Sequence, residues 1–464
     1  MEGNTYDQVS YSHLPTTETH PDRLAMLARL RGLNPPPVDR ARVLDLGANE
    51  GGCLIPMALS LPHAQFTGID FAAAPVERGN NIIGELGLGN ARLIQMNLLD
   101  VGASLGEFDY VIAHGLYAWT PEAVRDKVLA IASANLSRTG IAMVSYNTYP
   151  GAYERTMLRD MMLFHADGAV EPADRIRQAR AILALMARAN PEAKGIARTI
   201  AQEAERTLLR RDSAIFHDYM SDVYQPVYFR DFVAHAARHG LAYVEDASVI
   251  DTWNVSLTSE VQESVRQIAA GDRILQEQYL DLLRVRHFRC SLLCHDSSAP
   301  RRDWVNAQAA GMFAASSVQE TAPGTFVSTP GVRMETAHAG VVEFLRRCRE
   351  HWPEALPIAE QESDMAVALF QRGLIELRTV PGLAKRAGDR SLASPLARYQ
   401  VRRGPTVSTL LHTAVEIPHS AAREFLMLLD GTRDRPALAR ESVCSLDQVD
   451  RELENAASHG LLLG

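Results

Sequence analysis

The sequence lacks any long apolar run. None of its 464 residues belongs to an uninterrupted stretch of about 18 apolar residues, the length that a helix needs to cross a bilayer. Residues 1–6 are polar and lack the basic and apolar regions of a secretory signal peptide. These absences predict a cytoplasmic protein without membrane insertion.

Cysteine is scarce, and its count is odd. Scattered thiols in odd number favour reduced side chains over a disulfide framework. Three potential metal ligands cluster at 290–295, but they lie in an alternating, strand-like run with no second ligand pair, so no zinc site is expected there, and no other metal site is predicted. The five cysteines are Cys53, Cys290, Cys294, Cys348 and Cys444, and the third ligand of the cluster is His295.

An excess of positive charge is also missing, because the formal net charge is −9. A nucleic-acid-binding surface normally needs a basic patch, so no nucleic-acid partner is expected. The chain is 46% hydrophobic, which supplies enough apolar side chains for about two to four domains.

Strand and helix patterns alternate from residue 40 onward. The runs at 43–44, 108–113 and 141–144 are nearly continuous in apolar residues, as in strands covered on both faces. This pattern predicts a parallel α/β sheet. The expected strands are 42–47, 65–70, 91–98, 108–114 and 140–146, and the expected helices are 52–60, 74–87 and 121–135.

The next segments combine helices with two late strands. Residues 151–225 and 252–288 have helical, charged patterns, whereas 241–247 and 289–295 are strand-like. We expect the late strands to complete the sheet as an antiparallel edge. The helical blocks then become insertions into one domain that spans residues 1–296.

A repeated order of elements marks the rest of the chain. Two helices and a strand are expected at 336–351, 363–372 and 373–377, and the same order recurs at 419–430, 446–458 and 460–463. This duplication predicts two winged-helix-like α+β modules, at 297–392 and 393–464. Neither carries an evident basic recognition face, so protein contact or a structural cap is favoured over DNA binding.

The most informative motif is the turn that follows the first strand. Its residues Asp45, Gly47, Asn49 and Gly51 lack the middle glycine that a dinucleotide pyrophosphate requires, but suit S-adenosylmethionine, which has no pyrophosphate. Asp45 is expected to organise the turn and meet the cationic amino group. Asp70, at the end of the second strand, is expected to accept hydrogen bonds from both ribose hydroxyls.

Later strand ends supply the other candidate residues, because ligands of such sheets lie outside the carboxyl ends of the strands. Phe71 and Leu98 are predicted to contact the cofactor, and Asn97 to pair with the adenine amino group, with Asp100 as the alternative in a shifted register. The loops after the fourth and fifth strands are predicted to face the methyl acceptor. Their candidate residues are His114, which would also contact the cofactor, Tyr117, Asn147 and Tyr149.

Several motifs together resemble the bacterial class I methyltransferases with a methyltransferase regulatory domain, a family that includes protein-lysine methyltransferases acting on outer-membrane proteins. The matching motifs are YDQVSY at 6–11, THPDRL at 19–24, DLG at 45–47, IPMA at 55–58, HGLYAW at 114–119, SYNTYPG at 145–151, YQPVYF at 224–229 and FRCSLLCH at 288–295.

The resemblance implies a Rossmann-like sheet, S-adenosylmethionine as cofactor, and an amino-terminal segment with Tyr6 and Tyr11 that closes near it. Ala48 and Cys53 depart from the family pattern. A homodimer through the helical insertion is a further expectation that rests mainly on the resemblance.

The predicted activity is N-methylation of lysine side chains in proteins. Tyr117, Asn147 and Tyr149 would orient the acceptor nitrogen, and His114 would accept its proton. A small-molecule N- or O-methyltransferase and an S-adenosylmethionine-sensing interaction protein are the alternatives. Residues 114–119 and 145–151 contain no carboxylate cluster for the Mg²⁺ of a catechol-type enzyme.

Overall fold

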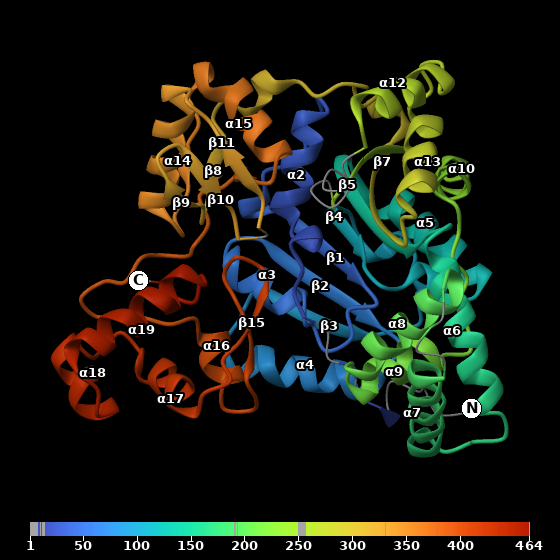
Figure 1. The fold of residues 1–464 in the computed structure, drawn as a ribbon, viewed down its shortest axis with the longest axis horizontal. Helices are drawn as coiled ribbons and strands as arrows, with labels where there is room; N and C mark the ends of the chain where they lie inside the picture. Colours follow the sequence, from blue (N-terminus) through green and yellow to red (C-terminus); the bar gives the residue numbers. More distant parts are fainter. Residues whose placement is uncertain are drawn as a thin grey trace.

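The computed structural model describes residues 8–463 apart from 10, 12, 13, 190, 191, 193, 249–256 and 330. In this part of the chain, the largest sheet has seven strands in the order β3-β2-β1-β4-β5-β7-β6. Figure 1 shows this sheet at the centre of the molecule, with the insertion helices at one end and the carboxyl-terminal half on the other side.

The first five strands pair in parallel, as the sequence predicts. They are β1 (Arg42–Leu46), β2 (Gln65–Asp70), β3 (Ala91–Gln95), β4 (Phe108–Ala113) and β5 (Leu136–Asn147). The connecting helices are α3 (Leu54–Ser60), α4 (Ala73–Glu85) and α5 (Glu122–Asn135), and α2 (Pro21–Leu30) precedes the sheet.

Both faces of the sheet are buried, which explains the nearly continuous apolar runs. Val43 lies in the core that includes residues of α2, α3 and α4. Its neighbour Leu44 lies in the opposite core, together with Leu129 of α5 and Phe232 of α10 (Phe229–Arg238). Successive strand residues therefore point to opposite faces of one sheet.

The two late strands join this sheet, but only one of them is antiparallel to the rest. β7 (Phe288–His295) pairs antiparallel with β5, and β6 (Leu241–Asp246) pairs antiparallel with β7. β6 consequently runs in the direction of β1–β5. The late strands thus complete the sheet through antiparallel pairings, as expected, and β7 fills the position between β5 and β6.

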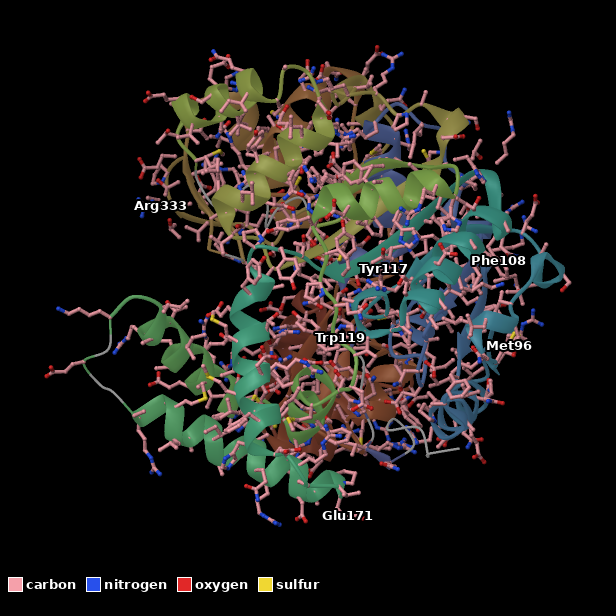
Figure 2. All side chains as sticks on the ribbon, turned by 90° about the vertical axis from the view of Figure 1, so that its right-hand side faces the viewer. Met96, Phe108, Tyr117, Trp119, Glu171 and Arg333 are labelled. Atoms are coloured by element: carbon pink, nitrogen blue, oxygen red, sulfur yellow. The ribbon has the colours of Figure 1, made fainter. Side chains whose placement is uncertain are left out.

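Helices fill both predicted insertions. The first contains α6 (Ala152–His165), α7 (Pro172–Arg188), α8 (Ile196–Leu208) and α9 (Asp212–Tyr219), and the second contains α12 (Ser259–Ile268) and α13 (Arg273–Arg284). The first insertion has an apolar core of its own, which includes Leu158, Leu183 and Ile215. Figure 2 shows Tyr117 and Trp119 near the middle of the molecule, and Tyr117 packs against Tyr146 of β5 and Phe232 of α10.

The carboxyl-terminal half contains the predicted helices and additional short strands. Residues 297–392 form α14 (Ala339–His351), α15 (Ser363–Gln371) and six strands, β8 (Phe313–Ala315), β9 (Gln319–Ala322), β10 (Thr325–Val327), β11 (Arg333–Glu335), β12 (Leu356–Pro357) and β13 (Glu376–Arg378). The last module forms α16 (Pro395–Gln400), β14 (Thr406–Ser408), β15 (Ala414–Glu416), α17 (Ser420–Leu428), α18 (Arg435–Ser442) and α19 (Leu446–Ser458). The strand expected at 460–463 is reduced to one bridge between Leu462 and Ala393.

All five cysteines have free thiols. Among the described residues, no helix combines the length and the apolar character needed to cross a membrane.

Candidate active site

The turn after β1 is held against the end of β2. The backbone N–H groups of Gly47 and Ala48 both donate to the carbonyl of Ile69, at 2.8 and 3.1 Å. Gly47 has a φ of 75°, a conformation that side-chain-bearing residues rarely adopt, and Asn49 also has a positive φ of 50°. This backbone folds the chain tightly over the end of the sheet, so that Gly47 and Asn49 line a cavity.

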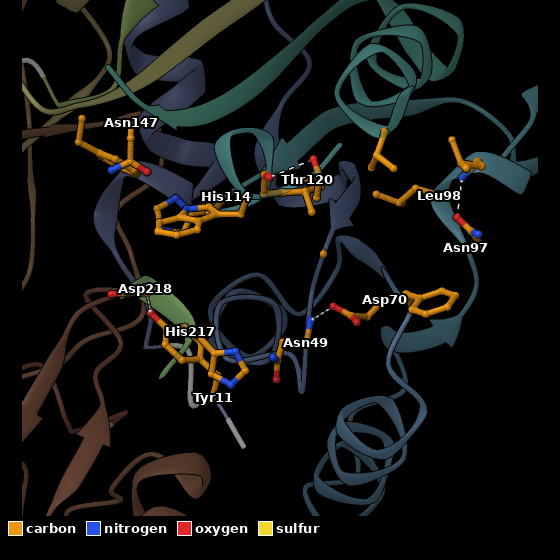
Figure 3. Close-up of a pocket in the computed structure, with 18 of the residues that line it drawn as sticks. Tyr11, Asn49, Asp70, Asn97, Leu98, His114, Thr120, Asn147, His217 and Asp218 are labelled. Atoms are coloured by element: carbon orange, nitrogen blue, oxygen red, sulfur yellow. Dashed lines mark hydrogen bonds between the residues drawn. The ribbon is translucent and has the colours of Figure 1, made fainter. Parts of the chain in front are cut away.

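The carboxylate of Asp70 holds the turn by accepting a hydrogen bond from its backbone. Its Oδ2 accepts the N–H of Asn49 at 2.8 Å (Figure 3), and its Oδ1 accepts the N–H of Ala72 at 2.9 Å. Each oxygen of a carboxylate has two lone-pair sites, so it can accept more than one hydrogen bond. Asp70 can therefore hold the loop and bind two adjacent hydroxyl groups of a ribose.

Asp45 lies behind the turn and outside the cavity lining. It is 4% exposed, and burial, followed by the charge of Asp70, raises the pKa of its carboxyl to about 7. Gly51 also lies outside the lining and forms the last part of the turn, with a φ of 80°. Asp45 and Gly51 therefore shape the turn on the side that faces away from the cavity.

The cavity has a volume of about 580 Å³, within the range of small-molecule sites. Residues from the ends of β1, β2, β3, β4 and β5 line it, together with the start of β7 and helix α9. The predicted residues among them are Tyr11, Gly47, Asn49, Asp70, Phe71, Asn97, Leu98, His114 and Asn147.

One end of the cavity is built from the loop after β3. Leu98 is buried, and the Oδ1 of Asn97 accepts the N–H of Leu99 at 3.0 Å. This bond uses the carbonyl oxygen of the Asn97 side chain, which leaves its NH₂ group for a ligand. A donor there matches a ring nitrogen of adenine better than the adenine amino group.

The other end is formed by His114 and Asn147. The ring of His114 meets the edge of Phe288, with centroids 6.0 Å apart and planes at 84°. Asn147 is 4% exposed, and its Oδ1 has no hydrogen-bond partner among the described residues. A buried carbonyl oxygen without a partner, on the wall of a cavity, indicates a ligand that carries a hydrogen-bond donor.

Tyr11 and Val9 contact helix α9 beside the cavity. The hydroxyl of Tyr11 donates to Asp218 Oδ1 at 3.2 Å, and its ring meets His217 at 5.2 Å. The Nε2 of His217 in turn lies 2.8 Å from the carbonyl of Val9. Tyr11 thus lines the cavity and contacts helix α9, whereas the candidate Tyr6 lies outside the described residues.

Two predicted catalytic residues point elsewhere. Tyr117 begins a short 3-10 helix, η5 (Tyr117–Trp119), is 2% exposed, and hydrogen-bonds the Nδ1 of His235 at 2.7 Å behind the cavity wall. Tyr149 packs against Tyr153, with centroids 4.3 Å apart, and does not line the cavity. Both tyrosines lie in loops that follow strand ends, as the sequence predicts. The local turns direct their rings away from the cavity.

Several lining residues were missed by the sequence reasoning. His287 and Phe288 reach the cavity because Asn147 pairs with Phe288 across the antiparallel β5–β7 ladder. The sequence predicts that antiparallel pairing, which places the start of β7 beside Asn147. His287 and Phe288 could therefore have been predicted as candidates. The other missed lining residues are Leu99, Gly115, Leu116, Thr120, Val124, Arg155, His217 and Asp218.

A second cavity of about 330 Å³ adjoins the first on the side of the insertion helices. The two cavities share Asn147, Arg155 and His287 in their linings. Glu154, Glu203 and Tyr224 line only the second one. Asn147 therefore lies where the two cavities meet.

The comparisons with known proteins cover most of the chain. Residues 37–181 match the family described as "Methyltransferase domain", residues 211–295 match "Predicted methyltransferase regulatory domain", and residues 389–457 match "PKMT, C-terminal winged helix domain".

Two proteins of Rickettsia prowazekii are similar in sequence. The uncharacterized protein RP789 is 35% identical over 294 residues, which are 63% of this chain and 53% of that protein. The uncharacterized protein RP028 is 32% identical over 235 residues, which are 50% of this chain and 94% of that protein. The chain therefore spans about half the length of the first relative and nearly all of the second.

The fold also matches a solved structure, PKMT2 from Rickettsia typhi in complex with AdoHcy. The TM-score is 0.86 at 23% identity, with 98% of this chain and 100% of that chain covered. The parallel sheet, the turn on Asp70 and the three matching regions agree with one another. The chain belongs to the family of S-adenosylmethionine-dependent methyltransferases that carry a methyltransferase regulatory domain and a PKMT winged-helix domain.

Proposed function

We propose that this protein transfers a methyl group from S-adenosylmethionine to the side-chain nitrogen of lysine in a protein acceptor. The observation that carries the proposal is the buried Oδ1 of Asn147, which lacks a partner among the described residues and lies where the two cavities meet. An acceptor amine entering from the second cavity would supply the missing N–H donor.

The residues of the first cavity fit the methyl donor. Asp70 would accept hydrogen bonds from both ribose hydroxyls, Leu98 would pack on the adenine, and the NH₂ of Asn97 would donate to a ring nitrogen. The backbone of Gly47 and Asn49 would pass beneath the methionine part. S-adenosylmethionine supplies an activated methyl group on a sulfonium, so the protein has chiefly to align the acceptor and exclude water.

A lysine must lose its proton before it can attack. Its pKa is about 10.4 in water, and burial in a cavity lowers this pKa because the charged form loses its solvation. Asn147 Oδ1 would accept one N–H of the neutral amine and so turn the nitrogen lone pair toward the methyl group. His114, on the same wall, would receive the departing proton.

The choice of a protein over a metabolite rests on the family. The carboxyl-terminal module matches a domain named for PKMT, protein lysine methyltransferase, and the whole chain shares the fold of PKMT2. The second cavity suits a long side chain, because it leads from Asn147 past Glu154 of α6 and Glu203 of α8. A homodimer, a cytoplasmic location and the lack of a nucleic-acid partner stay predictions.

The proposal is tested by supplying the purified protein with methyl-labelled S-adenosylmethionine and a cell lysate, then separating precipitated protein from the small-molecule filtrate. We expect label in the protein fraction. Label only in the filtrate would favour a metabolite methyltransferase. Tight cofactor binding without any transfer would favour a cofactor-sensing protein.

Variants at the cavity junction test the role of Asn147. Asn147→Ala should lower kcat with the protein fraction as substrate while the affinity for S-adenosylhomocysteine stays close to wild type. Asn80→Ala is a matched control. The Asn80 side chain hydrogen-bonds the backbone of Leu93 in β3 and lines neither cavity. An unchanged kcat for Asn147→Ala would remove this residue from the mechanism.

A further inference from the structure

A second group of chemically active side chains lies outside both cavities, between α5 and the end of α10. Asp126 Oδ1 lies 3.0 Å from Nε2 of His235 and 2.7 Å from Nε2 of His239. The three ligand atoms all lie within 4.8 Å of one another. One carboxylate and two imidazoles form a donor set that Zn²⁺ and neighbouring transition metals bind.

The two histidines are presented by one helix. His235 lies in the last turn of α10, and His239 is the residue that caps it. A spacing of four residues places both side chains on the same face of a helix. The same spacing presents a pair of histidines to zinc in other helical metal sites.

The imidazole of His235 is also held from behind. The hydroxyl of Tyr117 lies 2.7 Å from its Nδ1, which fixes the ring so that Nε2 faces Asp126. Histidines that bind metals commonly have such a partner on the second ring nitrogen, where it sets the tautomer and the ring orientation. Tyr117 does not line the cofactor cavity, and this contact indicates that its role is to hold the His235 ring.

Charge and access both suit a cation. The carboxyl end of a helix carries partial negative charge, so a cation at the end of α10 is favoured. The side chain of Asp126 is 55% exposed, which leaves the cluster open to solvent. The neighbouring guanidinium of Arg125 stacks over the ring of Tyr117 at 5.7 Å and bonds Gln225, so it is engaged away from the carboxylate.

We propose that Asp126, His235 and His239 bind one divalent transition-metal ion of the Zn²⁺ type, with water completing the coordination. The ion would replace the hydrogen bonds between these groups and connect α5 to α10. Through Tyr117 it would also stiffen η5, whose Trp119 lines the cofactor cavity. The inference does not depend on which acceptor is methylated.

The site is tested on untagged, full-length protein that has been treated with a chelator and desalted. Co²⁺ is titrated by visible absorption and Zn²⁺ by calorimetry, for the wild type and for His239→Gln, which removes one ligand. His63→Gln is the matched control, because His63 is exposed and is not part of the cluster. Far-ultraviolet circular dichroism confirms that each variant is folded.

We expect one ion per chain in the wild type and in His63→Gln, with the absorption of a low-symmetry Co²⁺ site. His239→Gln should bind at least tenfold more weakly, and Zn²⁺ should raise the Tm of the wild type but not of this variant. Equal binding by the wild type and His239→Gln, or no binding by the wild type, would overturn the proposal. Either result would leave three side chains joined by hydrogen bonds alone.

Discussion

At the scale of single residues, Asp70 combines two tasks in one carboxylate. Its two oxygens accept backbone N–H groups of Asn49 and Ala72, and the residue lines the cavity. A ribose bound to Asp70, as we propose, would therefore be coupled to the shape of the turn. Hydrogen bonds to a charged group contribute about 1.5–3 kcal/mol each.

The first prediction concerns this carboxylate. Asp70→Asn should weaken S-adenosylhomocysteine binding about tenfold to a hundredfold, because the amide has one acceptor oxygen and no charge. Calorimetry measures the change. Asp100→Asn is the control, since Asp100 is exposed and outside the cavity lining, and should keep the wild-type affinity. Equal losses in the two variants would contradict the assignment of Asp70.

The second prediction concerns the buried Asp45. Its pKa is 3.8 in the reference state and about 7 in the fold, so between these values the folded protein binds more protons than the unfolded chain. The stability of the ligand-free protein should therefore fall as the pH rises from 5 to 8. Asp45→Asn should remove part of this fall and raise the Tm at pH 8.

Thermal unfolding at several pH values measures this effect. The upper limit is a few kcal/mol, at about 1.4 kcal/mol for each pKa unit. A pH profile that is identical in the wild type and Asp45→Asn would show that Asp45 is not the group responsible.

Sequence position predicted many of the residues that line the first cavity, because strand ends in a parallel sheet meet at one edge. Asp70, Asn97 and His114 followed from that rule alone. The rule cannot give the direction of a ring after a turn, which is why Tyr117 and Tyr149 were expected at the acceptor. It also passes over residues such as Arg155, which reach the cavity from an inserted helix.

At the scale of elements, β6 and β7 are tied to helix α13 by a buried ion cluster. Arg289 of β7 is fully buried and bonds Asp281 at 2.7 Å, Glu277 at 3.0 Å and Asp246 at 3.4 Å. Its guanidinium also lies 3.9 Å from the centroid of the Phe229 ring. The cluster fixes the strand that carries His287 and Phe288 to the cavity.

The third prediction follows from this cluster. Arg289→Met should lower the free energy of unfolding by about 3–5 kcal/mol, because it leaves buried carboxylates without their partner. Urea unfolding measures the change. Arg333→Met is the control: Arg333 projects from the surface in Figure 2 and pairs with an equally exposed Glu335, so less than about 1 kcal/mol should be lost.

The order of elements was largely predictable, because apolar runs, glycines and caps mark strand and helix ends locally. The order of the two late strands was not, because the position of β7 between β5 and β6 depends on contacts between distant parts of the chain. The short strands β8–β11 also escaped prediction. Segments of three or four residues carry too little alternation to be distinguished from loops.

At the scale of the whole molecule, α2 and the segment before it contact all three regions of the chain. Asp22 Oδ1 accepts the backbone N–H of Thr379 at 2.7 Å and also its hydroxyl. Thr19 Oγ1 lies 2.8 Å from Nε2 of the buried His412 in the last module. The amino-terminal region thus holds the carboxyl-terminal half against the methyltransferase sheet.

The fourth prediction tests this connection. Asp22→Ala should lower stability by about 1–3 kcal/mol, because Thr379 loses its acceptor, and should speed proteolysis in the segment that follows Thr379. Urea unfolding and limited digestion measure both effects. Asp39→Ala, at an exposed position whose side chain pairs with the neighbouring Arg40, is the control and should leave the digestion pattern unchanged.

Sequence repeats indicated that the carboxyl-terminal half contains helical modules, but not where the modules dock. Contacts such as Thr19 with His412 join residues 393 positions apart, and no local pattern encodes them. The same limit applies to the acceptor, whose identity depends on surfaces formed by several regions together.

The central claim is that the two cavities bring a lysine side chain to the methyl donor. Its most direct test is mass spectrometry of proteins that have incorporated label from S-adenosylmethionine in the presence of the wild type, with Asp70→Asn as the inactive comparison. We predict one or more added methyl groups on lysine, absent with Asp70→Asn. Label confined to another residue type, or to small molecules, would contradict the account.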